Sequence, residues 1–316
     1  SLVGSEMCIR DSNRFEQWTL PLELGRWRLD LLHSPDFIPP FRGRFRRVIT
    51  VHDLNFLLYP QFLTAESRRY YNDQIRRAVR AADHILADSY ATRQDMIRLL
   101  DAPPEKITVV WLAANPCYRR LPPEETNAAL SHQRLTPGYV LFTGTLEPRK
   151  NVPGLLAAYR ALCERWRDAP PLVIAGRRGW LYQDIFARIR EWGLAERVRF
   201  IENPQDDTLV ALYNGAGVLV LPSFYEGFGL PVLEAMACGT PVVANDIPAL
   251  AEIVGDGAFL VETGSARAMA GAIIALLLQR PFRDSMVNQG LARATHFSWR
   301  KTARETLAVY ERVLQG

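Results

Sequence analysis

Several features that mark other protein classes are scarce or missing in this chain of 316 residues. It has four cysteines, none in a CxxC arrangement, which favours reduced thiols over disulfides or a zinc site. No run of eighteen or more apolar residues occurs, so the sequence predicts no membrane-spanning helix. The chain also does not open with the basic segment and apolar stretch of a secretory signal. Together these absences favour a cytoplasmic protein.

The common cofactor and metal signatures are missing as well. No GxGxxG motif opens a predicted strand–helix unit, which leaves a nicotinamide or flavin site unsupported, and the lack of GxxxxGK[ST] excludes P-loop NTPases. The pair Asp206–Asp207 stands at an expected helix start, where carboxylates cap free amides. The histidines other than His52 show no metal-ligand spacing: His33, His84, His132 and His296. We therefore expect no cofactor and no metal.

What the chain does have is an alternation of short apolar, β-branched runs with helical patterns, which is typical of βα units around a parallel sheet. Its length and its 48% hydrophobic content suffice for two domains with separate cores. The predicted class is α/β, with two facing Rossmann-like domains of which the first is incomplete. The expected strands are 29–35, 46–54, 84–89 and 107–112, followed by 139–145, 171–176, 198–202, 217–223, 241–246 and 257–262.

The expected domain boundaries follow from breaks in this alternation. The opening residues SLVGSEMCIRDS fit no amphipathic period and look like a non-native leader in front of a truncated domain. Residues 121–137 lose the alternation and have proline near both ends, which indicates an interdomain linker. We expect a leader at 1–12, a truncated first domain at 13–120, the linker at 121–137, a second domain at 138–297, and a C-terminal helix at 298–316 that packs back on the first domain.

A basic loop follows the first strand of the second domain, at the end of the strand where open α/β sheets bind ligands. In this loop, GTLEPRKN (144–151), Arg149 and Lys150 are adjacent cations that suit the oxygens of a diphosphate. The alternative is a solvated basic turn. A second basic loop, AGRRGW, ends at Trp180 and has arginines that we expect on the surface.

A second segment with candidate functional residues is FYEGFGLPVLEAM (224–236). It places Glu226 before a glycine-rich turn and Glu234 about one turn into the following helix. Free amides at a helix start suit anions and sugar hydroxyls, and the glycines let a ligand approach the backbone. A carboxylate at Glu234 can accept two hydrogen bonds from a vicinal diol such as a ribose. The alternative, a surface glutamate on an amphipathic helix, is weak because its neighbours Leu233 and Ala235 are apolar.

In the first domain, His52 ends a predicted strand in the segment TVHDL (50–54). A lone histidine is more often a satisfied core residue, but the carboxyl end of a strand also suits a functional role. The sequence leaves both interpretations open.

These segments resemble the large group 1 family of retaining, nucleotide-sugar-dependent glycosyltransferases with the GT-B fold. The resemblance extends over about residues 28–313 and is strongest at 139–262, where GTLEPRKN, LVIAGRRGW and PSFYEGFGLPVLEAMACGTPVVAND follow the family pattern. Many members have arginine where this chain has Thr145, which leaves Arg149 to supply more of the charge. The resemblance makes the first domain the acceptor domain and 138–297 the nucleotide-sugar donor-binding domain.

The resemblance also implies roles for individual residues. Glu226 corresponds to a glutamate that contacts hydroxyls of the transferred sugar, and Glu234 to one that holds the ribose. His52 corresponds to an active-site histidine that reaches the donor sugar, so His52 and Glu226 are the candidate catalytic residues. The candidate donor-binding residues are Arg149, Lys150, Gly227, Phe228, Gly229, Leu230 and Glu234.

The implied reaction is transfer of a hexose from a nucleoside diphosphate sugar to an acceptor hydroxyl, with retention at the anomeric carbon. The forms of GTLEPRKN and of the HDL motif look most like members that build cell-surface polysaccharide, often mannosyltransferases, so we expect GDP-mannose ahead of a UDP-sugar. The expected partners are this nucleotide sugar and a glycan or lipid-linked acceptor, and not nucleic acid.

Three points stay open at this stage. The arginine-rich helix expected at 66–81 suits an anionic membrane surface at the inner face, and equally a solvated basic surface. A phosphorylase with the same architecture is a second candidate function. A third is a nucleotide-binding fragment that does not turn over because its first domain is incomplete.

Overall fold

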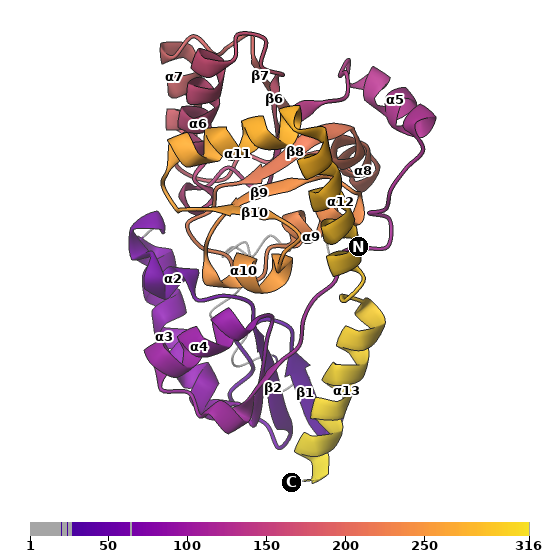
Figure 1. The fold of residues 1–316 in the computed structure, drawn as a ribbon. Helices are drawn as coiled ribbons and strands as arrows, with labels where there is room; N and C mark the ends of the chain where they lie inside the picture. The colour runs from indigo at the N-terminus through magenta and orange to yellow at the C-terminus, as the bar shows by residue number, and fades with distance from the viewer. Residues whose placement is uncertain (1–19, 21–23, 25–26, 64, 316) are drawn as a thin grey trace. The chain divides into compact units, whose positions relative to one another are not determined.

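The computed structural model describes residues 20, 24, 27–63 and 65–315, and the chain divides into two compact units. One unit combines Ser1–Leu112 with Trp299–Gly316, and the other is Ala113–Ser298 (Figure 1). Each has a parallel sheet and a hydrophobic core of its own, as the alternation of strands and helices predicts. The expected leader at 1–12 lies outside the described residues.

The first unit contains a four-stranded parallel sheet in the order β1-β2-β3-β4. Along β2, Ile49 and Val51 pack with residues of α3 and α4, whereas Val48 belongs to a separate cluster, as the two-residue period of a strand requires. The elements are β1 (Leu31–Ser34), β2 (Arg46–Val51), α2 (Asn55–Leu58), η1 (Pro60–Phe62), α3 (Ala65–Ala81), β3 (His84–Ala87), α4 (Tyr90–Leu100), η2 (Pro104–Lys106) and β4 (Ile107–Val109).

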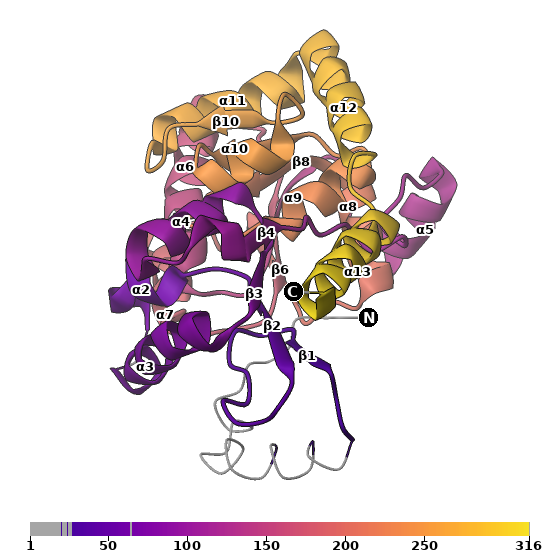
Figure 2. The same cartoon turned by 90° about the horizontal axis from the view of Figure 1, so that it is seen from below.

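The last helix of the chain, α13 (Trp299–Gln315), completes this unit. It lies along the sheet on the side opposite α3 and α4 (Figure 2), where Val309 packs with Val48. The Tyr310 hydroxyl is 2.5 Å from Nδ1 of His33 in β1. The C-terminal helix is therefore part of the core of the first unit.

The second unit contains a six-stranded parallel sheet in the order β10-β9-β8-β5-β6-β7. The helix α6 packs with α7 and α11, and α9 packs with α8, α10 and α12, so helices form a layer on each face of the sheet. The strands are β5 (Tyr139–Thr143), β6 (Leu172–Gly176), β7 (Val198–Glu202), β8 (Ala216–Leu221), β9 (Val242–Asn245) and β10 (Phe259–Val261). The helices are α5 (Pro123–His132), η3 (Pro148–Lys150), α6 (Val152–Arg165), α7 (Gln183–Glu191), α8 (Asp206–Gly215), α9 (Leu230–Ala237), α10 (Pro248–Val254), α11 (Ala266–Leu278) and α12 (Arg280–Ala294).

One segment differs from the expectation. Residues 121–137, predicted to be a linker, contain α5 and belong to the second unit. Pro123 occupies the first turn of this helix, where its missing N–H costs nothing, so here proline starts an element instead of interrupting one. Leu130 of α5 is fully buried in the core of the second unit. Within the described residues, no helix has the length and apolar character needed to cross a membrane.

Candidate functional site

The two charged loops of the second unit, 144–151 and 222–229, lie together at the switch point of its sheet. From β5, the sheet continues to one side with β6 and β7 and to the other with β8, β9 and β10. Ligands of doubly wound sheets bind at the carboxyl ends of the two strands where the order reverses. Those strands are β5 and β8, and they are followed by the loops 144–151 and 222–229. The topology therefore brings together both segments that the sequence singled out.

Polar contacts fasten these loops to each other. Asn151 adopts a left-handed conformation (φ 52°) and caps α6, accepting a hydrogen bond from the amide of Gly154 at 3.1 Å. Its Nδ2 donates to the carbonyl of Pro222 at 3.1 Å. The amide of Phe224 donates to the carbonyl of Arg149 at 2.9 Å. The start of α6 and the loop after β8 are thus one hydrogen-bonded assembly.

Glu226 lies at the centre of this assembly and is only 6% exposed. Its Oε1 accepts hydrogen bonds from Lys150 Nζ at 2.7 Å and Ser223 Oγ at 2.6 Å, and its Oε2 accepts one from Arg149 Nη1 at 2.7 Å. Burial alone would raise the pKa of Glu226, but the charges of Lys150 and Arg149 and the hydrogen bonds outweigh it and lower the pKa to about 2. Glu226 is therefore a carboxylate at neutral pH.

Arg149 is held by more than Glu226. Its Nη2 forms an ion pair with Oε1 of Glu147 at 2.5 Å, and its Nη1 also donates to the carbonyl of Tyr225 at 2.9 Å. Glu147 is itself 7% exposed. Sequence reasoning missed Glu147, although it lies inside GTLEPRKN and precedes a candidate cation by two residues.

The glycine-rich turn leads into α9 as predicted. Gly229 stands at the N-terminal cap with φ 105°, and a Cβ there would overlap Leu250, so glycine is required on both grounds. Leu230 is the first residue of α9, and Gly227 is buried. Phe228 is buried and makes an edge-to-face contact with Phe297, with ring centroids 5.9 Å apart. The Phe228 side chain therefore packs into the unit and supports the turn.

Glu234 faces a different set of groups from Glu226. Its Oε2 accepts a hydrogen bond from the hydroxyl of Tyr213 at 2.8 Å, and that hydroxyl is 2.8 Å from Thr143 Oγ1 at the end of β5. Burial raises the pKa of Glu234 to about 7, with Asp206 acting in the same direction, while the Tyr213 hydrogen bond and the charge of Lys150 oppose the rise. The two glutamates thus differ in charge state near neutral pH. Tyr213 and Thr143 were not predicted.

The first unit has its own cluster at the carboxyl edge of its sheet. His52 follows β2, Asp88 follows β3, and Asp36 lies two residues beyond β1. His52 Nδ1 is 2.7 Å from Asp88 Oδ2, with 55% of the histidine side chain exposed and 5% of the aspartate. Burial acts to lower the pKa of His52, but Asp88 and then Asp36 outweigh it and raise the pKa to about 9. His52 is therefore a paired, partly exposed cation and not a core histidine.

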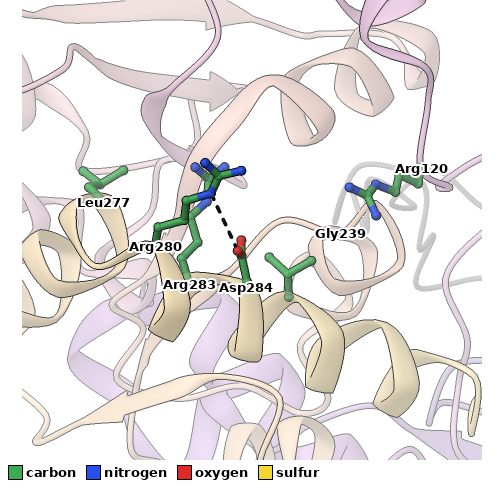
Figure 3. Close-up of a pocket in the computed structure, with 7 residues that line it drawn as sticks. Arg120, Gly239, Leu277, Arg280, Arg283 and Asp284 are labelled. Atoms are coloured by element: carbon green, nitrogen blue, oxygen red, sulfur yellow. Dashed lines mark ion pairs between the residues drawn. The ribbon is translucent and has the colours of Figure 1, made fainter.

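The second unit also has a hollow away from these loops. About 480 Å³ in volume, it is lined by Arg120, Gly239, Leu277, Arg280, Arg283, Asp284 and Val287 (Figure 3). Gly239 precedes β9, so this hollow lies toward the amino edge of the sheet, away from the loops after β5 and β8. Its single ion pair, Arg280–Asp284, spans 3.8 Å between largely exposed side chains. It shares no residue with the candidate site. In the part of the chain that the structure describes, no group of three metal-binding side chains occurs.

The fold and the two sheet edges define a class, a two-unit α/β protein of the GT-B type. Residues 125–293 match the family described as glycosyl transferases group 1, and residues 10–116 match glycosyltransferase family 4. The chain is 36% identical over 283 residues to the O-antigen chain mannosyltransferase B of Escherichia coli, covering 89% of this chain and 74% of that protein. This chain belongs to the group 1 family of glycosyltransferases.

Two further proteins are similar to this chain, one in sequence and one in structure. The serotype-specific mannosyltransferase WbdA of Escherichia coli is 28% identical over 293 residues, which is 90% of this chain but only 36% of that protein. The solved structure of HepE from Anabaena in complex with UDP and glucose has the same fold, with a TM-score of 0.79 at 20% identity. That match covers 95% of this chain and 83% of HepE.

Proposed function

We propose that this chain transfers mannose from GDP-mannose to a hydroxyl of a glycan or lipid-linked acceptor in the synthesis of cell-surface polysaccharide, with retention at the anomeric carbon. The observation that carries the proposal is the buried Glu226, held ionised by Lys150 and Arg149 at the switch point and beside the glycine-lined start of α9. The similarity to a bacterial O-antigen mannosyltransferase supports mannose as the sugar.

The geometry of Glu226 suits an acceptor of sugar hydroxyls. A carboxylate has about four acceptor positions, and three are occupied by Lys150, Ser223 and Arg149. The remaining one, on Oε2, can accept a hydroxyl of the transferred hexose. A low pKa and three bonds to the protein make Glu226 a poor general acid and a poor nucleophile. This favours a front-face reaction, in which the departing diphosphate helps to deprotonate the acceptor, over a covalent glycosyl–enzyme intermediate.

Charge neutralisation of the leaving diphosphate falls to Lys150. Its ammonium has three N–H donors, and Glu226 is the one hydrogen-bond partner of that group among the described residues. A cation fixed before the reaction stabilises the negative charge that develops on the leaving group. In the first unit, the protonated His52 is 55% exposed and is held by Asp88 and by a hydrogen bond to the backbone of Pro35.

Donor identity is tested by calorimetric titration of the protein with GDP, UDP and ADP. We expect GDP to bind most tightly, and GDP-mannose to release GDP when acceptor saccharides with a lipid-like aglycone are added. The anomeric configuration of the product, read by NMR, then tests retention. If UDP bound more tightly than GDP, the donor would be a UDP-sugar and not GDP-mannose. Phosphate-dependent cleavage of a glycan with no nucleotide bound would reject the transferase in favour of a phosphorylase.

The role of Lys150 has a separate test. Lys150→Ala should weaken GDP binding by about ten-fold or more and guanosine binding hardly at all, because a charge-assisted contact to phosphate contributes about 1.5–3 kcal/mol. Both affinities are measured by calorimetry on the same preparation. Equal losses for the two ligands would show that Lys150 does not contact the diphosphate.

A further inference from the structure

The guanidinium of Arg149 is directed at the protein itself. It donates to the carboxylates of Glu147 and Glu226 and to the carbonyl of Tyr225, and its own carbonyl accepts the amide of Phe224. Arg149 is 13% exposed in its side chain, and the two carboxylates are 7% and 6% exposed. Arg149 thus bonds both the backbone of the loop after β8 and the side chain that the loop presents.

The charges in this cluster balance. Two cations, Arg149 and Lys150, face two buried carboxylates, Glu147 and Glu226. Both Nη1 hydrogens of Arg149 are given to Tyr225 and Glu226, and its Nη2 donates to Glu147, so a diphosphate at Arg149 would compete with Glu147 for this guanidinium. Removing one partner of a buried ion pair is strongly destabilising, because it leaves the other charge buried and uncompensated. Lys150 can reach a phosphate without breaking a bond of Glu147.

We infer that Arg149 is a positioning residue, anchored by Glu147, that fixes the loop 224–226 and so orients Glu226, and that it is not a ligand of the donor diphosphate. This inference rests on the proposed function for the identity of the donor, but the contacts that carry it are present without one. It assigns a role to Glu147 and gives different roles to the two adjacent cations of GTLEPRKN. Arg149 shapes the site, and Lys150 supplies charge to the leaving group.

The variant Glu147→Gln best distinguishes a positioning role of Arg149 from a phosphate-binding role. If Arg149 bound the diphosphate, removal of the competing carboxylate would free its guanidinium, and GDP would bind more tightly relative to guanosine. If Arg149 positions Glu226, the ratio of GDP to guanosine affinity stays within about two-fold, while kcat for transfer falls by about ten-fold or more because Glu226 loses its alignment. Arg149→Lys, which keeps the charge but loses the fork, should behave in the same way.

A second readout needs no nucleotide. The guanidinium of Arg149 donates to the carbonyl of Tyr225, and the amide of Phe224 donates to the backbone carbonyl of Arg149, so hydrogen exchange of the segment 223–229 in the ligand-free protein reports on the loop that Arg149 holds. We expect this exchange to accelerate by about ten-fold or more in Glu147→Gln and in Arg149→Lys, with the exchange of β5 and β8 unchanged. Unchanged strand exchange also shows that each variant is folded.

The chain offers a matched control in the ion pair between Arg178, just after β6, and Glu202, the last residue of β7. Their Nη2 and Oε2 atoms are 3.2 Å apart, and both side chains are about half exposed. Arg178→Lys and Glu202→Gln should leave both readouts as in the unaltered protein, because exposed pairs contribute little. Unchanged exchange of 223–229 in Glu147→Gln overturns the inference, and so does tighter GDP binding. Faster exchange in a protein that binds neither GDP, UDP nor ADP upholds the positioning role and rejects the proposed donor instead.

Discussion

At the scale of single residues, the candidate site depends on neighbours that set the charge of its functional groups. Asp88 is the clearest case, because it is almost fully buried and holds His52 through a 2.7 Å contact. Without this carboxylate, the burial of His52 and the ordinary basicity of an imidazole would leave the ring neutral at physiological pH. Asp88 therefore determines whether His52 acts as a cation.

Asp88→Asn should lower the pKa of His52 from about 9 to near or below its ordinary value of 6.5. In the unaltered protein the folded pKa is raised, so the stabilisation from the charged pair is complete below 6.5 and is lost as the pH rises through about 9. The variant should lose this dependence and should slow glycosyl transfer at neutral pH. NMR titration of the His52 ring measures the shift, and an unchanged pKa would show that Asp88 does not control His52.

Tyr213 lowers the pKa of Glu234, whereas Asp88 raises that of His52. Tyr213→Phe removes a hydrogen bond that lowers the pKa of Glu234, so that pKa should rise further above about 7. If the ribose is held by the carboxylate form, guanosine affinity increases as the pH rises through this pKa, and in the variant the midpoint moves upward by about one pH unit. Calorimetry across the neutral range measures it. A midpoint at the original pH would mean that Tyr213 does not set the pKa of Glu234.

These residues also mark where sequence reasoning ended. Lys150 and Glu226 could be singled out because a charge in a loop after an apolar strand has few structural reasons to be there, and Glu234 because its neighbours in the helix are apolar; their functional roles stay predictions. Asp88 and Tyr213 could not, because each acts only through a partner more than twenty positions away in the chain. A carboxylate after a strand or a tyrosine in a helix gives no signal until the sheet order is known.

At the scale of elements, the loops are set by how helices begin. Asn151 ends η3 in a left-handed conformation, caps α6 and bonds the carbonyl of Pro222, so one side chain fixes the start of a helix and the loop of a neighbouring strand. The ends of β5 and β6 also pack closely, because a Cβ at Gly176, the last residue of β6, would overlap the carbonyl of Gly144. These contacts link the loops at the switch point to each other and to the helix that follows.

Asn151→Ala should therefore destabilise the second unit by about 2 kcal/mol or more, since it removes the cap and places a Cβ-bearing residue with no side-chain hydrogen bond at positive φ. Urea denaturation followed by circular dichroism measures the loss. Asn151→Gly keeps the left-handed conformation and should cost less, which separates backbone strain from the lost hydrogen bonds. Equal stability of the alanine variant and the unaltered protein would show that the cap contributes nothing.

The positions of the strands and helices were the most predictable feature of the structure. All six strands of the second sheet and the four of the first lie within a few residues of the apolar runs that predicted them, because buried parallel strands are short, apolar and β-branched. The exception is α5, whose polar face and flanking prolines gave the composition of a linker. Its burial depends on Leu130 meeting a core built from distant strands, which local composition does not encode.

At the scale of the whole molecule, the chain leaves the first unit at Leu112 and returns to it at Trp299. The last helix therefore contributes to the core of the unit in which the chain starts. Within the first unit, Val309 fills a cluster with Val48, Leu86 and Val110, and Thr302 Oγ1 donates to the carbonyl of Trp111 at 2.6 Å. The stability of the first unit thus depends on the final residues of the chain, while the second unit has a core of its own.

This dependence predicts separate responses of the two units. Val309→Ala should destabilise the first unit by about 1–2 kcal/mol, because a fully buried side chain loses two methyl groups. The core of the second unit contains none of these residues, so its transition should stay in place, and it should be the one that GDP raises if GDP binds as proposed. Differential scanning calorimetry with and without GDP resolves the two effects. Leu307→Ala, on the same helix but 54% exposed, is the matched control and should shift neither transition. If Val309→Ala moved a single common transition that GDP also raised, the two units would unfold as one body, and the C-terminal helix would stabilise the donor site as well.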